Sequence, residues 1–277
     1  MGKGLKITLG VLGVLAVFLI IGGFWFYSTF YAMGPLAVLS LEEGTTQYKA
    51  EDSWKDAKSG MELEQGYSVK TLEDSKAKII FSDSVMRLDA ETEIKLDELT
   101  QKSVSLTQSI GKTWSRILKI SGISDYEVTT PNAVATVRGT AFSVDSEAEQ
   151  TKIKVADGTV EVDSYKEKDD LEEDKEITIK KDDTDLEDKE EKLVTDEWVK
   201  DNLEEDEEHI EEIKKKYTEK YGTLFDKIIE QQGLSDEEGA DLIDDWVDGK
   251  YSIQEEIEKG TIPEELVSII PPELKRY

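Results

Sequence analysis

The sequence predicts a chain of three parts: an N-terminal transmembrane helix, an all-β domain of short strands with glycine turns, and an acidic α-helical C-terminal region. Three observations predict this order. The chain opens with an uncharged apolar stretch, continues with residues that alternate between apolar and polar, and changes to a period of about 3.6 from residue 195. Because many short strands are separated by turns, we expect the β domain to be a roll or a solenoid-like structure.

Residues 7–27 predict a membrane anchor. They carry no charge, and a helix of this length, at about 1.5 Å per residue, crosses a hydrocarbon core of about 30 Å. Lys3 and Lys6 precede the stretch and the next basic residue is Lys49, so the positive-inside rule predicts a short cytoplasmic stub at residues 1–6 and a body outside the cell membrane. The alternative is a cleaved signal peptide, whose apolar core would be only about 7–15 residues long.

Composition excludes several classes of function. The chain has 277 residues, a net charge of −29 and no cysteine. The lack of cysteine excludes disulfides, thiolate nucleophiles and cysteine-based metal sites. The negative charge, most of which follows residue 165, repels the phosphates of nucleic acid and of anionic membranes. We therefore expect no nucleic-acid partner.

The predicted β domain covers residues 35–163, and its most informative stretch is 129–162. Here strand-like runs at 134–137 and 141–144 flank the tripeptide Arg138-Gly139-Thr140, and a further pair of runs is separated at Asp157-Gly158. Glycine is expected where the backbone needs a positive φ, because it has no Cβ atom. Gly139 and Gly158 are therefore predicted to form the turns between strands.

This stretch, read as TP-NAVATVRGTAFSV followed by TKIKVADGTVEV, resembles the signature of the FecR domain family, in which a VRGT-F-V core precedes a hairpin. Segments 60–71, 74–83 and 86–96 resemble the steps that come before this core in the family. One departure is Ser84, where the family often has a glycine. The motif residues, with either a structural or a partner-binding role, are Pro131, Val137, Arg138, Gly139, Thr140, Phe142 and Gly158.

Arg138 has two interpretations. Its planar guanidinium could pair with a carboxylate of a partner, or it could tie the turn to a carboxylate or carbonyl of the same domain. Because Val137 and Phe142 beside it are core-type residues, we favour the structural role.

The resemblance implies a regulatory function. In the family, an envelope domain receives a signal from a transporter and relays it across one membrane helix to a cytoplasmic sigma factor. Residues 1–6 cannot supply the cytoplasmic segment of such a relay. We therefore expect a single-pass, extracytoplasmic binding or sensory module that is not an enzyme, with an envelope protein as partner and the bilayer in contact with residues 7–27. The alternatives are a sigma-factor regulator that works through a separate cytoplasmic partner, and an envelope carbohydrate-active enzyme with paired carboxylates.

The second half of the chain is highly charged. Residues 164–194 read as an acidic linker in which only 176–180 resembles an edge strand. Residues 195–277 form the acidic helical region, with Thr195 as a plausible N-cap of the first helix and Gly233 as its C-terminal stop. A W-x-x-x-N-x-x-x-D pattern in this helix resembles a segment often found after FecR domains, and it consists of Trp198, Asn202 and Asp206.

No catalytic, cofactor or metal site is predicted. His209 is the only histidine, and its place among glutamates on a helix favours a partly exposed structural residue over a general base. The acidic clusters at 169–174 and 182–188 could collect Ca²⁺, but they lack the spacing of an EF-hand, so we do not expect a dedicated site. Glycine-rich phosphate loops are also missing from the sequence.

Overall fold

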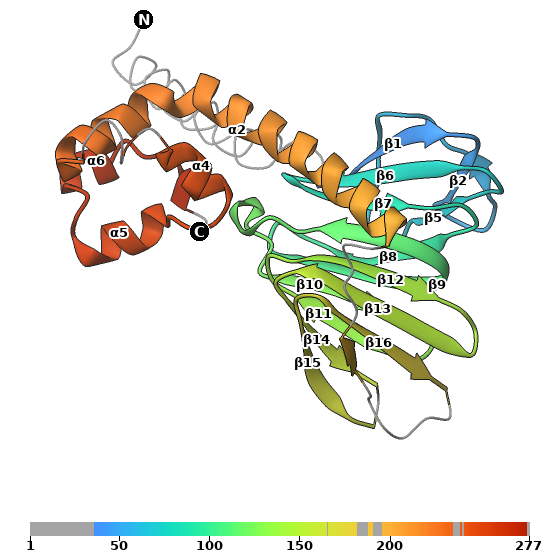
Figure 1. Cartoon of the computed structure of the whole chain (residues 1–277). Helices are drawn as coiled ribbons and strands as arrows, with labels where there is room; N and C mark the ends of the chain where they lie inside the picture. Colours follow the sequence, from blue (N-terminus) through green and yellow to red (C-terminus); the bar gives the residue numbers. More distant parts are fainter. Residues whose placement is uncertain are drawn as a thin grey trace, which may run out of the picture. The chain divides into compact units, whose positions relative to one another are not determined.

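The computed structural model describes residues 36–275 except for positions 165, 182–187, 191–195, 235–238 and 240. Leu36–Tyr277 forms one compact unit, described here by itself. The described residues contain 17 strands, which join in one hydrogen-bonded network (Figure 1). In chain order they are β1 (Val38–Glu43), β2 (Thr46–Lys49), β3 (Lys55–Asp56), β4 (Met61–Glu62), β5 (Ser68–Thr71), β6 (Lys76–Phe81), β7 (Ser84–Leu88), β8 (Glu93–Leu99), β9 (Ser103–Arg116), β10 (Asp125–Thr129), β11 (Val134–Val137), β12 (Ala141–Ser146), β13 (Gln150–Asp157), β14 (Thr159–Asp163), β15 (Lys168–Glu172), β16 (Lys175–Lys180) and β17 (Asp188–Glu190).

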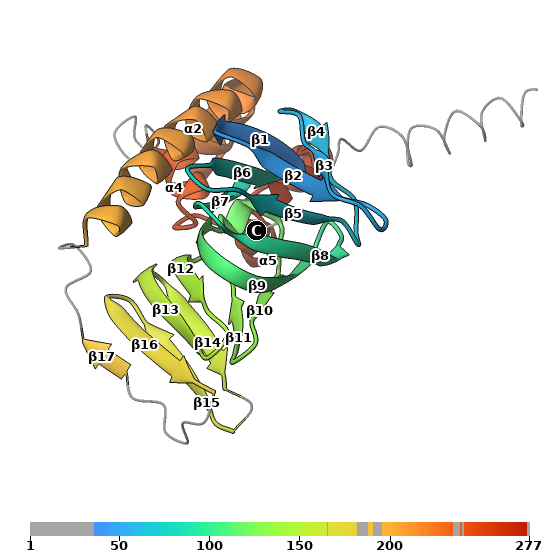
Figure 2. The ribbon, with the colours of Figure 1, turned by 90° about the vertical axis from the view of Figure 1, so that its right-hand side faces the viewer.

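The network consists of two sheets that share the long strand β9 (Figure 2). Sheet A has the strand order β4-β1-β6-β7-β9-β12-β13-β16-β17, and sheet B has the order β3-β2-β5-β8-β9-β10-β11-β14-β15. Residues 103–110 of β9 pair within sheet B and residues 111–116 pair within sheet A. Gly111 lies at this change with φ +95°, where a Cβ atom would overlap Thr92. The pairing is antiparallel except between β9 and β10, which makes the network mixed.

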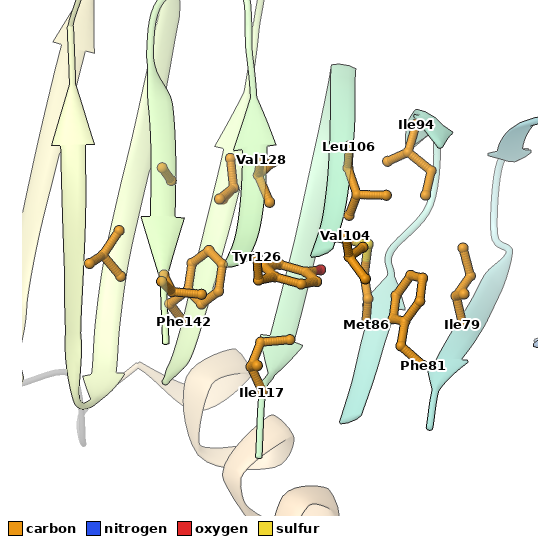
Figure 3. Close-up of a cluster of buried hydrophobic side chains, with 14 of the residues drawn as sticks. Ile79, Phe81, Met86, Ile94, Val104, Leu106, Ile117, Tyr126, Val128 and Phe142 are labelled. Carbon is orange, nitrogen blue, oxygen red and sulfur yellow. The ribbon is translucent and has the colours of Figure 1, made fainter. Parts of the chain in front are cut away.

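The core lies between the two sheets. In β6, for example, Ala77, Ile79 and Phe81 are buried while Lys76 is exposed, which is the period of two that a sheet with one covered face requires. Tyr126 packs edge-on against Phe81, with ring centroids 6.2 Å apart, and against the ring of Phe142 at 6.1 Å (Figure 3). Its hydroxyl lies 3.1 Å from Ser115 Oγ, and burial raises the pKa of Tyr126 well above its usual value.

The helices follow the strands and form a second apolar cluster. They are α2 (Glu197–Gln232), α4 (Leu242–Val247), α5 (Ile253–Lys259) and α6 (Glu264–Val267), with the 3₁₀ turns η1 (Lys119–Ser121) and η3 (Pro272–Lys275). Trp246 of α4 lies fully buried between Tyr217 and Phe225 of α2, and Leu118 and Ile120 from the loop after β9 join the same cluster. The loop at η1 therefore connects the strand core to the helical core.

The ends of α2 follow the capping rules. Asp196 is its N-cap, one residue after the position expected, and its side chain accepts hydrogen bonds from Trp198 N and Val199 N. Gly233 ends the helix in the left-handed conformation, with φ +69°, as predicted.

The expected fold class is wrong. It placed a transmembrane helix before an all-β roll or solenoid and a separate helical region. The structure instead has one large mixed β-network with a long helix packed on it. Among the described residues, no helix is both long and apolar enough to cross a membrane. The predicted anchor at residues 7–27, and with it the predicted bilayer contact and cell location, falls outside the described residues.

Residues 164–194, expected as an acidic linker with one edge strand, contain β15, β16 and β17. β15 pairs with β14, and β16 pairs with both β13 and β17. Leu171, Ile177 and Ile179 are buried and belong to the strand core. These few apolar side chains, spaced two apart in β16, are enough to seat a strand in which most other residues are charged.

Candidate functional site

The VRGT motif forms a corner where the chain passes from one sheet to the other. β11 belongs to sheet B and β12 to sheet A, and Gly139 between them has φ +71°. The chain returns from β13 to β14 at a second corner, where Gly158 has φ +88°. Positive φ values of this kind favour glycine, so both residues are required by the backbone.

The two corners pack directly against each other. A Cβ atom at Gly158 would lie 3.0 Å from Gly139 O and 3.1 Å from Thr140 Oγ1. Thr140 Oγ1 donates a hydrogen bond to Thr159 O at 3.1 Å, which ties one corner to the other. Val137 and Phe142 are buried in the strand core on either side. Five of the seven motif residues, including the two glycines, therefore have a structural role at the corners.

Arg138 differs from its neighbours because it is exposed. Its side chain has no hydrogen bond or ion pair to any described residue, so the expected tie to its own domain is not found among them. It lines an open groove of about 470 Å³ at the end of β11, β14 and β15. The other lining residues are Lys119, Ser124, Thr136, Val137, Gly139, Gly158, Thr159, Glu161 and Asp170.

Pro131 lies away from this groove. It is exposed in the turn between β10 and β11, at the opposite end of β11 from Arg138. The turn is held by Thr130, whose Oγ1 accepts a hydrogen bond from Ala133 N at 3.0 Å and donates one to Ala133 O at 2.9 Å. The motif residues are thus divided between the two ends of one strand.

Lys119 connects the motif corner to the helices. A Cβ atom at Gly139 would overlap the Cγ atom of Lys119, and a Cβ atom at Gly249, after α4, would lie 2.8 Å from its Cδ atom. The aliphatic part of the lysine therefore passes between two glycines that both have positive φ, at +71° and +72°. We call this arrangement the lysine clasp. Sequence reasoning missed it, because residues 119, 139 and 249 carry no shared pattern.

Helix α2 is attached to the outer face of sheet A by a buried acid. Asp206 is only 2% exposed, and its carboxylate accepts hydrogen bonds from Arg87 Nη1 at 2.5 Å and from Trp114 Nε1 at 2.9 Å. Arg87 also pairs through Nε with Glu205 at 2.7 Å. Burial raises the pKa of Asp206 above its usual value, against the opposing effect of the Arg87 charge.

The W-x-x-x-N-x-x-x-D pattern lies along this contact. Trp198 packs edge-on against Trp114 at 5.9 Å, and the ammonium of Lys112 lies 3.6 Å from the centroid of the Trp198 ring. Asn202 is buried one turn further, and Asp206 follows after another turn. Spacing of four residues places all three side chains on one face of the helix. The four-residue spacing of this pattern could have identified the docked face of α2, but in the sequence it supported only a resemblance to a family segment.

A second buried acid holds the middle of α2. Asp83, in the turn between β6 and β7, accepts hydrogen bonds from Lys216 Nζ at 2.7 Å and from Tyr217 Oη at 2.9 Å. His209 Nε2 lies 3.0 Å from the backbone oxygen of Asp83. The only histidine is therefore a partly buried structural contact of the helix, as its sequence context favoured.

Ser84 follows Asp83 at the position where the family often has glycine. It is fully buried, and its Oγ accepts a hydrogen bond from Leu118 N at 2.9 Å. The departure from the family pattern thus supplies a bond that fixes the start of the loop at η1.

Ca²⁺ binding has no geometric support in the described part of the chain, since it contains no group of three or more His, Asp or Glu side chains placed to hold a metal ion. Asp169 and Asp170 of the first acidic cluster are exposed on β15, and most of the second cluster lies outside the described residues. No residue of the described part is therefore assigned as a metal ligand.

Comparison with known proteins gives one family. Residues 67–161 match the family model described as FecR protein. The search of curated proteins found no match. Two similar solved structures are both of a candidate anti-sigma factor from Parabacteroides distasonis ATCC 8503. One is 20% identical with a TM-score of 0.42 over 48% of this chain and 64% of that chain, and the other is 21% identical with a TM-score of 0.41 over 46% and 61%. The matches span less than two thirds of those proteins.

Proposed function

We propose that this chain is a non-catalytic regulatory protein of the FecR type that acts by binding another protein, because residues 67–161 match the FecR family model. The observation that carries the proposal is the contrast within the VRGT motif. Val137, Thr140 and Phe142 are buried, whereas Arg138 is exposed and has no partner among the described residues.

An exposed, unpaired arginine on a rigid corner suits recognition. Its guanidinium offers a planar fork of donors to a carboxylate, and the glycine corner that carries it costs little to order on binding because Thr140 already fixes it. The groove beside it supplies hydroxyl and backbone groups from Ser124, Thr136 and Thr159. We therefore expect a partner segment that presents an Asp, a Glu or a C-terminal carboxylate to Arg138.

The paired-carboxylate enzyme gains no specific support from the described residues. The cleft between α2 and strands β1, β6 and β7 is lined by Glu42, Glu43, Glu205, Glu208 and Glu212. Of these, Glu42 lies 2.6 Å from Lys78 Nζ and Glu205 lies 2.7 Å from Arg87 Nε. Acid–base catalysis on a glycosidic bond needs two carboxyl groups that converge on the substrate. Glu42 and Glu205 are held by cations of the protein, and all five carboxylates of this cleft are exposed. None is therefore a buried carboxyl group of the kind that serves as the general acid.

The test compares transcripts in cells that produce the native chain, no chain, Arg138→Glu, or Lys58→Glu. Lys58 is exposed and outside the motif, so it is a control with the same change of sign. We expect loss of the chain and Arg138→Glu to alter the same set of transcripts, while Lys58→Glu behaves as native. A sigma factor as the partner would give changes confined to one promoter class.

Two further measurements complete the test. Arg138→Glu should keep the melting temperature of the native protein, because an exposed residue without partners adds little to stability, within about 0.5 kcal/mol. Arg138→Lys keeps the charge and removes the fork, so an intermediate effect would indicate bidentate recognition. If removing the whole chain leaves the transcripts unchanged, the regulatory function is wrong. If removal changes them and Arg138→Glu does not, only the assignment of Arg138 is wrong.

A further inference from the structure

A second surface, separate from the Arg138 groove, lies beside α2. It is a cleft of about 580 Å³ between the helix and the outer face of β1, β6 and β7. Helix α2 is attached to β7 and β9 beside this cleft, because Asp206 binds Arg87 and Trp114 and because Trp198 packs on Trp114. The floor is apolar, with Val85 buried and Ile80 partly exposed.

Some charged side chains of the cleft form ion pairs with one another, and others do not. Lys78 is bound to Glu42, and Arg87 is bound to Glu205 and Asp206, so these groups neutralise one another. The side chains of Glu43, Glu208 and Glu212 have no hydrogen bond or ion pair to described residues, and Lys76 is the one lining cation in the same state. Three open carboxylates therefore face one open ammonium group.

The geometry of the acids is regular. Glu208 and Glu212 are four residues apart on α2, which places them on one face of the helix at adjacent turns. Glu43 ends β1 on the opposite wall of the cleft. An occupant would meet negative charge from both walls and an apolar floor at Ile80.

We propose that this cleft binds a basic, amphipathic helical segment of a partner protein. Two Lys or Arg side chains one turn apart would pair with Glu208 and Glu212, and an apolar side chain between them would cover Ile80. We choose a basic occupant because of charge complementarity: most of the charged side chains of the cleft without an ion pair are acidic. The net charge of −29 also disfavours binding to anionic partners such as nucleic acid or acidic lipid. The proposal does not depend on Arg138.

The test measures binding of a fluorescent synthetic helix of Leu, Ala and Lys, with lysines four residues apart, to the full chain by anisotropy. Since a chain this acidic attracts any cation, the informative comparison is between two charge-matched double variants of α2. Glu208→Gln/Glu212→Gln removes two acids that line the cleft, whereas Glu204→Gln/Glu207→Gln removes two exposed acids that do not. We expect the first to weaken binding about 5–10-fold and the second less than 2-fold, in keeping with the modest strength of exposed ion pairs.

A second readout locates the peptide. Methyl signals of Ile80 and Val85 in the NMR spectrum should shift on its addition, and Arg138→Glu should leave both the shifts and the affinity unchanged. Equal weakening by the two double variants would mean non-specific attraction to an acidic chain and would overturn the proposal. Failure of this test leaves the transcript result for Arg138 intact, and failure of the transcript test leaves this one intact, so the two can be told apart.

Discussion

The outer faces of the two sheets differ, and the difference explains where the helix binds. On sheet A, the outward residues Trp114 and Ala141 are apolar and fully buried under Val199 of α2. On sheet B, the outward residues of the central strands are hydroxyls and carboxylates that remain partly exposed and bond to each other, as Ser105 Oγ does with Glu127 Oε1 at 3.1 Å. A strand that is apolar on both faces needs a cover, and one with a polar outer face does not.

The most damaging test of this comparison is Trp114→Ala. The side chain is fully buried, packs on Trp198 and donates to Asp206, so its removal should cost about 3–5 kcal/mol in the free energy of unfolding. Thr136→Ala on the outer face of sheet B is the control, with an expected change within about 0.5 kcal/mol. Urea unfolding followed by far-UV circular dichroism measures both. Equal costs would show that the outward face of sheet A does not hold the helix.

The buried ion pair gives the next effect in size. Asp206→Ala leaves the Arg87 guanidinium without its buried partner, and we expect a loss of about 3 kcal/mol. Arg87→Met combined with Asp206→Leu removes both charges and should lose less than Asp206→Ala alone, because no buried charge is left unpaired. The same urea experiment measures the free energy of unfolding of the native protein, of Asp206→Ala and of the double variant. A double variant that is less stable than Asp206→Ala would mean that the pair adds net stability.

Two glycine substitutions should act in opposite directions. Gly139→Val forces a branched side chain onto a residue with φ +71° and against Lys119, so we expect a loss of about 1–3 kcal/mol and a lower melting temperature. Gly222 lies within α2 with open space around it, and Gly222→Ala should raise stability by about 0.5–1 kcal/mol. Calorimetry of both variants provides the measurement. An unchanged melting temperature for Gly139→Val would show that a side chain at position 139 causes no backbone strain or overlap with Lys119.

The smallest effect concerns pH at the start of α2. Burial opposes ionisation of Asp196, but the hydrogen bonds from Lys154 and Val199 outweigh it, so the pKa of Asp196 lies below its usual value. A lowered carboxyl pKa contributes stability above the pKa of the unfolded chain, about 3.9, and this contribution is lost as pH falls through the lower folded value. Asp206 makes a contribution of the opposite sign to the pH dependence of stability. Its pKa is raised in the folded protein, so proton binding favours the folded state as pH falls.

The expected result is therefore local. Hydrogen exchange at the amides of Trp198 and Val199 should accelerate as pH falls below about 4, once the intrinsic pH dependence of exchange is subtracted. Lys154→Met should move the onset to higher pH, since it removes the ammonium that holds Asp196 ionised. If the onset stays in place in that variant, Lys154 does not set the pKa.

The features of this molecule that the sequence predicted correctly are those that depend on residues close together in the chain. Alternation located β6 and β11, and positive φ explains why glycine stands at 139 and at the end of α2. These features depend on neighbours within a few residues.

The rest depended on contacts between distant parts of the chain. Arg87 and Asp206 are 119 residues apart, and Tyr217 is 134 residues from Asp83, and nothing in either local sequence names the other. The fold class failed for the same reason, since a strand shared by two sheets is a matter of long-range pairing. In the segment after residue 164, the charges of Lys168–Glu172 predicted a solvated linker, whereas the structure has a strand there with Leu171 buried.

The lysine clasp has a consequence for how the protein is made. Synthesis proceeds from the N-terminus, so Lys119 and Gly139 leave the ribosome long before Gly249, the residue that closes the other side of the clasp. The strands can pair as they emerge, but the packing of Lys119 against Gly249 must wait until α4 and the residues after it have been translated. The Thr140–Thr159 hydrogen bond of the corner can therefore form before the C-terminal helices exist, whereas Lys119 gains its contact with Gly249 only after they are complete.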